Sequence, residues 1–239
     1  MILYDTDYAE IYRQMSAERE KAKYYSQKYS REAIRKFERH RLPCEHHVIQ
    51  TMPASRNTYM HYYYAAKEAE VRDNCIFFGN LLLVNDMYGK QYAIRLMTVS
   101  ILAGAVSVGT ADSLNIFTGH FLSRYRERFS YLKDVPSHEL IASFAGRNLG
   151  YIHPLDYKEF VLEENRQENG AAWGIDDGVS LGQSWLEEID GTPVIINLHK
   201  TFLGRHILND RQRETAPSQE EMRSSLMNHF ILKNHNFHG

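Results

Sequence analysis

One stretch decides how the rest of this chain is interpreted: Thr118-Gly119-His120-Phe121-Leu122-Ser123-Arg124-Tyr125-Arg126-Glu127-Arg128-Phe129. Its first residue, Thr118, is suited to cap the start of a helix. An apolar stripe then recurs at helical spacing, formed by Phe121, Tyr125 and Phe129. A polar stripe recurs about 100° away, formed by His120, Arg124 and Arg128. The polar stripe therefore borders the buried face of the predicted helix, where the wall of a cleft would lie.

The residues after this helix predict a second helix and then a set of strands. Pro136-Ser137 opens the second helix, and its apolar face ends in Phe144. The strands follow after a polar linker at 151–170, and they cover 172–175, 179–186 and 193–199. The order of a helical pair followed by antiparallel strands predicts an α+β module over residues 115–208.

The N-terminal half predicts a long helix followed by a small antiparallel sheet. Residues 5–41 have helical periodicity and a capping-box pattern, Asp7 with Glu10. Strands are predicted at 47–51, 58–65, 74–84 and 91–101, and a loop at 104–113. An amphipathic helix is predicted at 217–233. The chain thus divides into a helical arm, an antiparallel β region, the helix-pair module, and a C-terminal helix with its tail, whose bounds are 1–43, 44–114, 115–208 and 209–239. The same four segments also suit one compact domain.

Composition and charge narrow the class of protein. The formal net charge of -2 excludes a wholly basic nucleic-acid binder but allows a local basic patch. Residues 156–190 hold ten acidic residues against two basic ones, whereas residues 118–133 hold four basic residues against one acidic. Two cysteines in a chain of 239 residues, with neither a secretory signal nor an apolar run of spanning length, favour a cytoplasmic protein without a membrane segment.

The polar stripe suggests phosphate chemistry. Two guanidinium groups one helical turn apart can bind a phosphate bidentately, and an imidazole in line with them can act as acid or base. This interpretation makes Arg124 and Arg128 phosphate-binding residues and His120 a catalytic residue. The competing interpretation is an exposed basic helix face with an ordinary Arg–Glu pair, which is common on surface helices.

The string His120-x-x-x-Arg124-Tyr125-x-Glu127-Arg128 resembles the opening helix of RelE-like toxin domains, which belong to the barnase, EndoU, colicin and RelE group of ribonucleases. The resemblance covers roughly residues 115–208 and rests on a short motif. It implies a metal-free attack of the ribose 2′-OH on the adjacent phosphate. It also implies that His120 matches the family's helix histidine, and that Arg124 and Arg128 match its arginines. The acidic linker and the N-terminal half have no counterpart in a minimal toxin.

The end of the last strand supplies a second group of candidate residues. His199 is a candidate catalytic partner of His120, and Lys200 and Thr201 are candidate phosphate-binding residues. This prediction requires the last strand to lie beside the 118–130 helix. The alternative is a strand end with a solvated lysine and a threonine that caps a following turn.

Other histidine and aromatic clusters carry weaker signals. Neither Cys44 with His46 and His47, nor the histidines of the C-terminal tail, has the spacing of a zinc site, so we expect no metal and no cofactor. The tyrosines at 59 and 62–64 follow strand alternation, which favours packing within a sheet over stacking on nucleic-acid bases.

Two hypotheses for function follow. The first is a ribonuclease-like protein that binds RNA or another phosphate-bearing ligand and cleaves a phosphodiester without a metal. The second is a non-enzymatic interaction or assembly protein, whose terminal helices bind a protein partner or a second copy of the chain.

Overall fold

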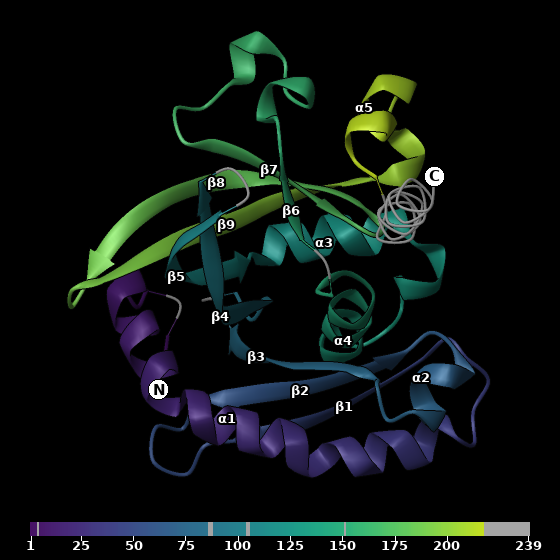
Figure 1. The fold of residues 1–239 in the computed structure, drawn as a ribbon. Helices are drawn as coiled ribbons and strands as arrows, with labels where there is room; N and C mark the ends of the chain where they lie inside the picture. Colours follow the sequence, from purple (N-terminus) through teal and green to yellow (C-terminus); the bar gives the residue numbers. More distant parts are fainter. Residues whose placement is uncertain (4, 86–87, 104–105, 151, 218–239) are drawn as a thin grey trace, which may run out of the picture.

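The described strands form one mixed sheet with the order β1-β2-β3-β4-β5-β9-β8-β7-β6 (Figure 1). The computed structural model describes residues 1–3, 5–85, 88–103, 106–150 and 152–217. Five strands come from the first half of the chain: β1 Cys44–Thr51, β2 Thr58–Ala65, β3 Phe77–Asn85, β4 Gln91–Ala103 and β5 Val106–Phe117. Four come from the second half: β6 His153–Leu155, β7 Gly170–Ile175, β8 Gly178–Ile189 and β9 Thr192–Gly204.

The two strand regions meet where β5 and β9 pair in parallel. The pairing runs from Asp112 opposite Val194 to Phe117 opposite His199, and every other strand pair is antiparallel. The α+β class is therefore confirmed, but the predicted small sheet is wrong, because both regions contribute to one nine-stranded sheet.

Of the predicted loop at 104–113, residues 104–105 lie outside the described residues, and from 106 onward the prediction is wrong, since β5 covers Val106–Phe117. Its alternation was obscured by polar residues that are buried in the fold, namely Asp112, Ser113 and Asn115. These side chains have hydrogen-bond partners on other elements, which offsets the cost of removing them from water. A polar sequence pattern therefore concealed a central strand.

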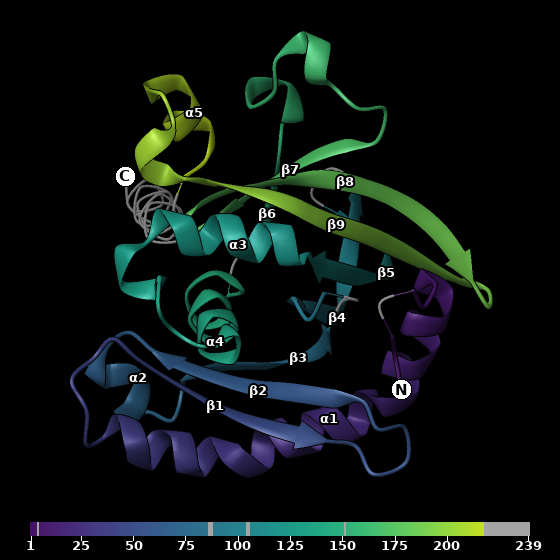
Figure 2. The same ribbon diagram turned by 180° about the vertical axis from the view of Figure 1, so that it is seen from behind.

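Helices cover both faces of the sheet. The long helix α1 Tyr8–Phe37 lies on one face, and α3 Gly119–Arg128 and α4 Ser137–Asn148 lie on the other, between the two wings of the sheet (Figures 1 and 2). Two shorter helices are α2 Glu68–Arg72 and α5 Asp210–Thr215. The predicted pair of helices is thus confirmed. The C-terminal helix predicted at 217–233 lies outside the described residues, which end at 217.

Each face of the sheet buries its own apolar core. The core under α3 and α4 includes Phe117, Phe121, Phe144 and Phe202. The core under α1 is rich in aliphatic side chains, among them Ile11, Met15, Ile94, Leu114 and Ile196. Since its apolar side is buried in this way, α1 is a packed element of the body and not a free arm. Its N-terminus is capped as predicted, because the Asp7 carboxylate accepts a hydrogen bond from the backbone N–H of Glu10 at 2.7 Å.

The predicted linker at 151–170 contains regular structure. Strand β6 pairs with β7, and two short 3-10 turns follow at Tyr157–Glu159 and Glu163–Asn165. Glycines opposite this segment make room for its rings, since a Cβ on Gly174 would lie 2.1 Å from the His153 ring. The polar composition of the segment did not reveal strand β6, because its pairing depends on residues of β7 such as Gly174 opposite His153. The two-residue turn Asp190–Gly191 between β8 and β9 is confirmed, and both residues have positive φ.

A buried carboxylate ties α1 to the centre of the sheet. Asp112 accepts hydrogen bonds from the Tyr12 hydroxyl at 2.8 Å, the Arg19 guanidinium at 2.6 Å and the Thr98 hydroxyl at 2.7 Å. These donors come from α1 and from β4, the strand beside Asp112. Although burial opposes the shift, the hydrogen bonds from Arg19, Thr98 and Tyr12 lower the pKa of Asp112. Asp112 is thus held ionised at the junction of three elements.

We expect Asp112→Ala to lower the free energy of unfolding by about 2 kcal/mol, because it leaves the buried Tyr12 hydroxyl and the Arg19 guanidinium without their shared acceptor. Asp190→Asn is the control, since Asp190 forms a solvent-exposed pair with Arg13 of α1 and asparagine tolerates its positive φ. Urea denaturation of both variants measures the difference. Equal midpoints for the two variants would contradict the role assigned to Asp112.

Candidate functional site along helix α3 and strand β9

Helix α3 begins where β5 ends and continues beside β9. At its start, the backbone N–H and the hydroxyl of Thr118 both donate to the carbonyl oxygen of His199, at 3.1 and 3.0 Å. At its other end, a Cβ built on Gly204 would lie 3.6 Å from the Cβ of Arg128. Residues 118–128 therefore lie alongside residues 199–204. The last strand thus lies beside the 118–130 helix, as the sequence prediction required.

The stripe of His120, Arg124 and Arg128 borders the buried face of α3. Phe121 and Tyr125 are fully buried, whereas His120 and Arg124 are exposed. Arg124 donates to the carboxylate of Glu127 at 2.8 Å, which is the Arg–Glu pair of the competing interpretation. Such an exposed pair is worth less than about 1 kcal/mol, so a bound phosphate can compete for the guanidinium.

Arg128 has a different environment from Arg124. Its side chain is half-buried, and its Nε has no hydrogen-bond partner within the part of the chain that the structure describes. A buried donor without a partner costs free energy that an acceptor at this position would recover. Because this atom is buried, a ligand can reach it only if the Arg128 side chain moves outward.

His199 is fully buried on the inner side of β9. Its ring stacks on Phe117 with centroids 4.3 Å apart, and the ring of Trp173 lies at the same distance. Ser180 Oγ lies 2.7 Å from Nδ1, and Asn115 Oδ1 lies 3.3 Å from Nε2. Burial lowers the pKa of His199 to about 3. The imidazole is therefore neutral at physiological pH, and both of its nitrogens are occupied.

A buried polar network fixes the tautomer of His199. Asn197 Nδ2 donates to Asn115 Oδ1 and to Ser113 Oγ, each at 3.1 Å, so that Asn115 presents an acceptor to the ring. Nε2 of His199 therefore carries the hydrogen, and Nδ1 accepts from Ser180. The network extends to Ser184, which donates to Asn197 Oδ1 at 2.7 Å. Sequence reasoning missed it, although the alternating polar residues Ser113 and Asn115 on β5, and Asn197 and His199 on β9, were the available signal.

Lys200 and Thr201 lie at an irregularity in the ladder of β8 and β9. The register shifts between Leu181 and Gly182, which pair with Thr201 and His199, so Lys200 is the additional residue of a bulge. Lys200 Nζ donates to the side-chain oxygen of Gln183, a neutral acceptor. Both residues are half-buried. The Lys200 ammonium group at this bulge thus has the neutral side chain of Gln183 as its partner.

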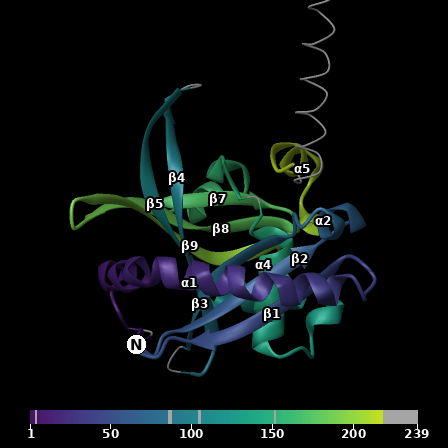
Figure 3. The same cartoon turned by 60° about the horizontal axis from the view of Figure 1, so that its bottom comes forward.

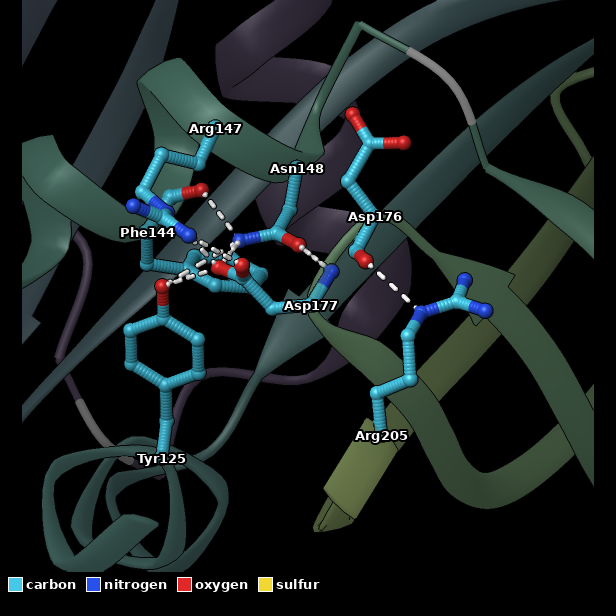
Figure 4. Close-up of polar contacts among 7 residues, drawn as sticks. All are labelled: Tyr125, Phe144, Arg147, Asn148, Asp176, Asp177 and Arg205. Atoms are coloured by element: carbon cyan, nitrogen blue, oxygen red, sulfur yellow. Dashed lines mark hydrogen bonds and ion pairs between the residues drawn. The ribbon is translucent and has the colours of Figure 1, made fainter. Parts of the chain in front are cut away.

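A second cluster, which the sequence did not predict, holds α3 and α4 against the β7–β8 turn (Figure 4). Arg147 donates to the two carboxylate oxygens of Asp177 at 3.0 and 2.5 Å, and the Tyr125 hydroxyl donates to the same group at 2.6 Å. Asn148 both donates to the Asp177 carboxylate and accepts from the Asp177 backbone, each at 2.9 Å. Against the effect of burial, Arg147 lowers the pKa of Asp177. The cluster fixes the side of α3 that faces away from solvent.

Comparisons with protein-family models, curated proteins and solved structures found no match. Within the described residues, no three histidine, cysteine or acidic side chains lie close enough together to hold a metal ion. No helix in that part of the chain is long and apolar enough to span a membrane. The site is therefore interpreted from its own residues.

The buried histidine predicts that acid destabilises the fold. The pKa of His199 is about 3 in the folded state, against about 6.5 in an unfolded chain. The unfolded state therefore binds an additional proton below about pH 6.5, and stability falls as pH falls through this window. Burial lowers the pKa of His61 to about 4, which acts in the same direction.

We expect His199→Gln to reduce the loss of unfolding free energy between pH 7 and pH 5.5 by about 1 kcal/mol, because the variant lacks one group that the unfolded state protonates. Urea denaturation of both proteins at the two pH values measures this difference. The variant is also less stable at pH 7, so the comparison concerns the slope. Parallel slopes for wild type and variant would contradict a neutral, buried His199.

Proposed function

We propose that the chain binds RNA and cleaves it without a metal along α3 and β9. The observation that carries this proposal is the hydrogen bonding of Thr118 to His199, which brings two segments some eighty residues apart side by side. All six predicted site residues then belong to adjacent elements, with His120 and Arg124 open to solvent. The resemblance to RelE-like toxin domains supports the same assignment.

In this proposal the exposed and the buried residues have different roles. His120 is the catalytic acid or base, since an exposed imidazole can reach a substrate hydroxyl. Arg124 and Arg128 bind the phosphate and stabilise its developing negative charge. Lys200 bonds to Gln183 and Thr201 lies opposite Leu181, both on the face of the sheet away from α3, so neither contacts the phosphate that the arginines bind. His199 is a positioning residue, because its carbonyl oxygen accepts the start of α3 and its ring is buried beneath.

The reaction follows from these roles. The ribose 2′-oxygen attacks the adjacent phosphorus while its proton passes to His120. The bond from phosphorus to the 5′-oxygen breaks, and that oxygen leaves with a proton from solvent. The product is a 2′,3′-cyclic phosphate, and the arginines carry the additional charge of the pentacoordinate state.

The assembly hypothesis is the second candidate for the function. In its original form it used the terminal helices, but the apolar side of α1 packs on the sheet and the C-terminal helix lies outside the described residues. What α1 presents outward is a charged surface with an exposed Tyr24. Partner binding through this surface remains a prediction.

The first test is cleavage of single-stranded RNA in EDTA. We expect wild type to release products that end in a 2′,3′-cyclic phosphate, and His120→Ala to reduce the rate by at least about 100-fold. The control is His40→Ala, which removes another exposed histidine from outside the site. If wild type does not cleave, or if His120→Ala cleaves at the rate of wild type, the catalytic part of the proposal is wrong.

The second test separates RNA binding from catalysis. We expect Arg124→Ala and Arg128→Ala each to weaken binding of a single-stranded oligonucleotide and to lower the slope of log affinity against log salt by about 0.7. Arg72→Ala is the matched control, since Arg72 is an exposed arginine on α2 that also pairs with an acidic neighbour. Fluorescence anisotropy at several salt concentrations measures the slopes. Equal slopes for all three variants would refute a phosphate contact at α3.

A further inference from the structure

The hairpin of β4 and β5 extends beyond the strands beside it, as Figure 3 shows. On one side, β4 pairs with β3 only as far as Ile94 opposite Leu82. On the other side, β5 pairs with β9 only from Asp112 onward. From Arg95 to Ala103, the outer edge of β4 therefore has no partner among the described strands. The part of β4 from Leu96 onward and the part of β5 up to Ala111 form a two-stranded projection, here called the hairpin arm.

The sequence of the hairpin arm lacks the usual protection of a free edge. Residues 96–111 contain no Asp, Glu, Lys, Arg or Pro, and they are rich in Val, Leu, Ser and Thr. Proteins ordinarily place lysine or proline on exposed edges to prevent pairing with another chain. An isolated two-stranded ribbon is also marginally stable in water. The arm thus combines an open edge with a composition that favours strand pairing.

We propose that a second copy of this chain covers the edge, with the two β4 strands paired antiparallel about a two-fold axis at Val99. In this register Val99 faces its own copy, Thr98 faces Ser100, and Met97 faces Ile101. Arg95 then lies opposite Ala103, so no like charges meet across the axis. Apart from Arg95 opposite Ala103, the opposed residues are similar in polarity, and such cross-strand pairs contribute to the stability of a sheet.

The composition of the hairpin arm favours a second copy of the chain over a nucleic acid or a charged protein partner. A nucleic acid needs cations, and residues 96–111 supply none. A charged partner would lose solvation at a neutral edge without a compensating ion pair. A neutral, self-matching strand satisfies the free backbone groups without either cost. The dimer would join two nine-stranded sheets into one continuous sheet, and it does not depend on the proposed RNA cleavage.

A disulfide trap at the axis tests the register. In an antiparallel pair, directly opposed residues have Cα atoms about 4.5–5.5 Å apart, which a disulfide can bridge. Val99→Cys is made in a chain with Cys44→Ser and Cys75→Ser, because both native cysteines are free and Cys75 is exposed. We expect a disulfide-linked dimer to form under mild oxidation and to disappear with reductant.

Val108→Cys is the matched control for the trap. Val108 is exposed on β5, and in the proposed dimer the two β5 strands lie three strand spacings apart, about 14 Å. A disulfide cannot bridge that distance. We therefore expect no more cross-linked dimer from Val108→Cys than from the cysteine-free chain. Equal cross-linking of Val99→Cys and Val108→Cys would overturn the register.

A charge at the axis tests the dimer without cross-linking. Val99→Lys places two lysines opposite each other, which disfavours the pairing. By sedimentation equilibrium, we expect wild type at tens of micromolar to approach twice the chain mass of 27.9 kDa, and Val99→Lys to remain near that mass. An unchanged far-UV circular dichroism spectrum establishes that the variant is folded. A monomeric wild type, or a Val99→Lys variant that is folded and dimeric, would overturn the proposal.

Discussion

The parallel pairing of β5 with β9 is the constraint on which the arrangement of this molecule depends. It joins two antiparallel groups of strands that would otherwise be separate sheets. A parallel pair also requires a crossover connection, and here that connection contains α3 and α4. Because α3 leaves the end of β5, it lies beside the part of β9 that extends beyond the pairing. The candidate site is thus a consequence of the topology.

Buried polar groups define the register around this junction. Asn115, Asn197 and His199 share the inner side of the sheet, and each has partners on a neighbouring strand. A shift of one residue would turn these side chains toward the aliphatic core under α1, where they would lose their partners. On the opposite side of α3, the Asp177 carboxylate links Tyr125 with Arg147. The helix is therefore held at fixed positions on two sides.

Local signals in the sequence were sufficient for the elements that depend on periodicity and turns. The helix at 118–128, its cap at Thr118 and the Asp190–Gly191 hairpin were all predicted from such signals. Strand β5 and the Asp177 cluster were not predicted, because a polar residue can be assigned to a core only when its partner is known. For His199 the strand was identified correctly, but its burial depends on Phe117 and Trp173 from other strands.

The separation along the chain between β5 and β9 also sets an order for folding. The first five strands pair with neighbours in sequence, as does the hairpin of β8 and β9 around its two-residue turn. The junction must wait until residue 199 has left the ribosome, and such distant pairings form slowly. During synthesis the uncharged hairpin arm is therefore present before the sheet is complete. The cell must therefore produce this chain while the unpaired edge of the arm precedes the strands that complete its fold.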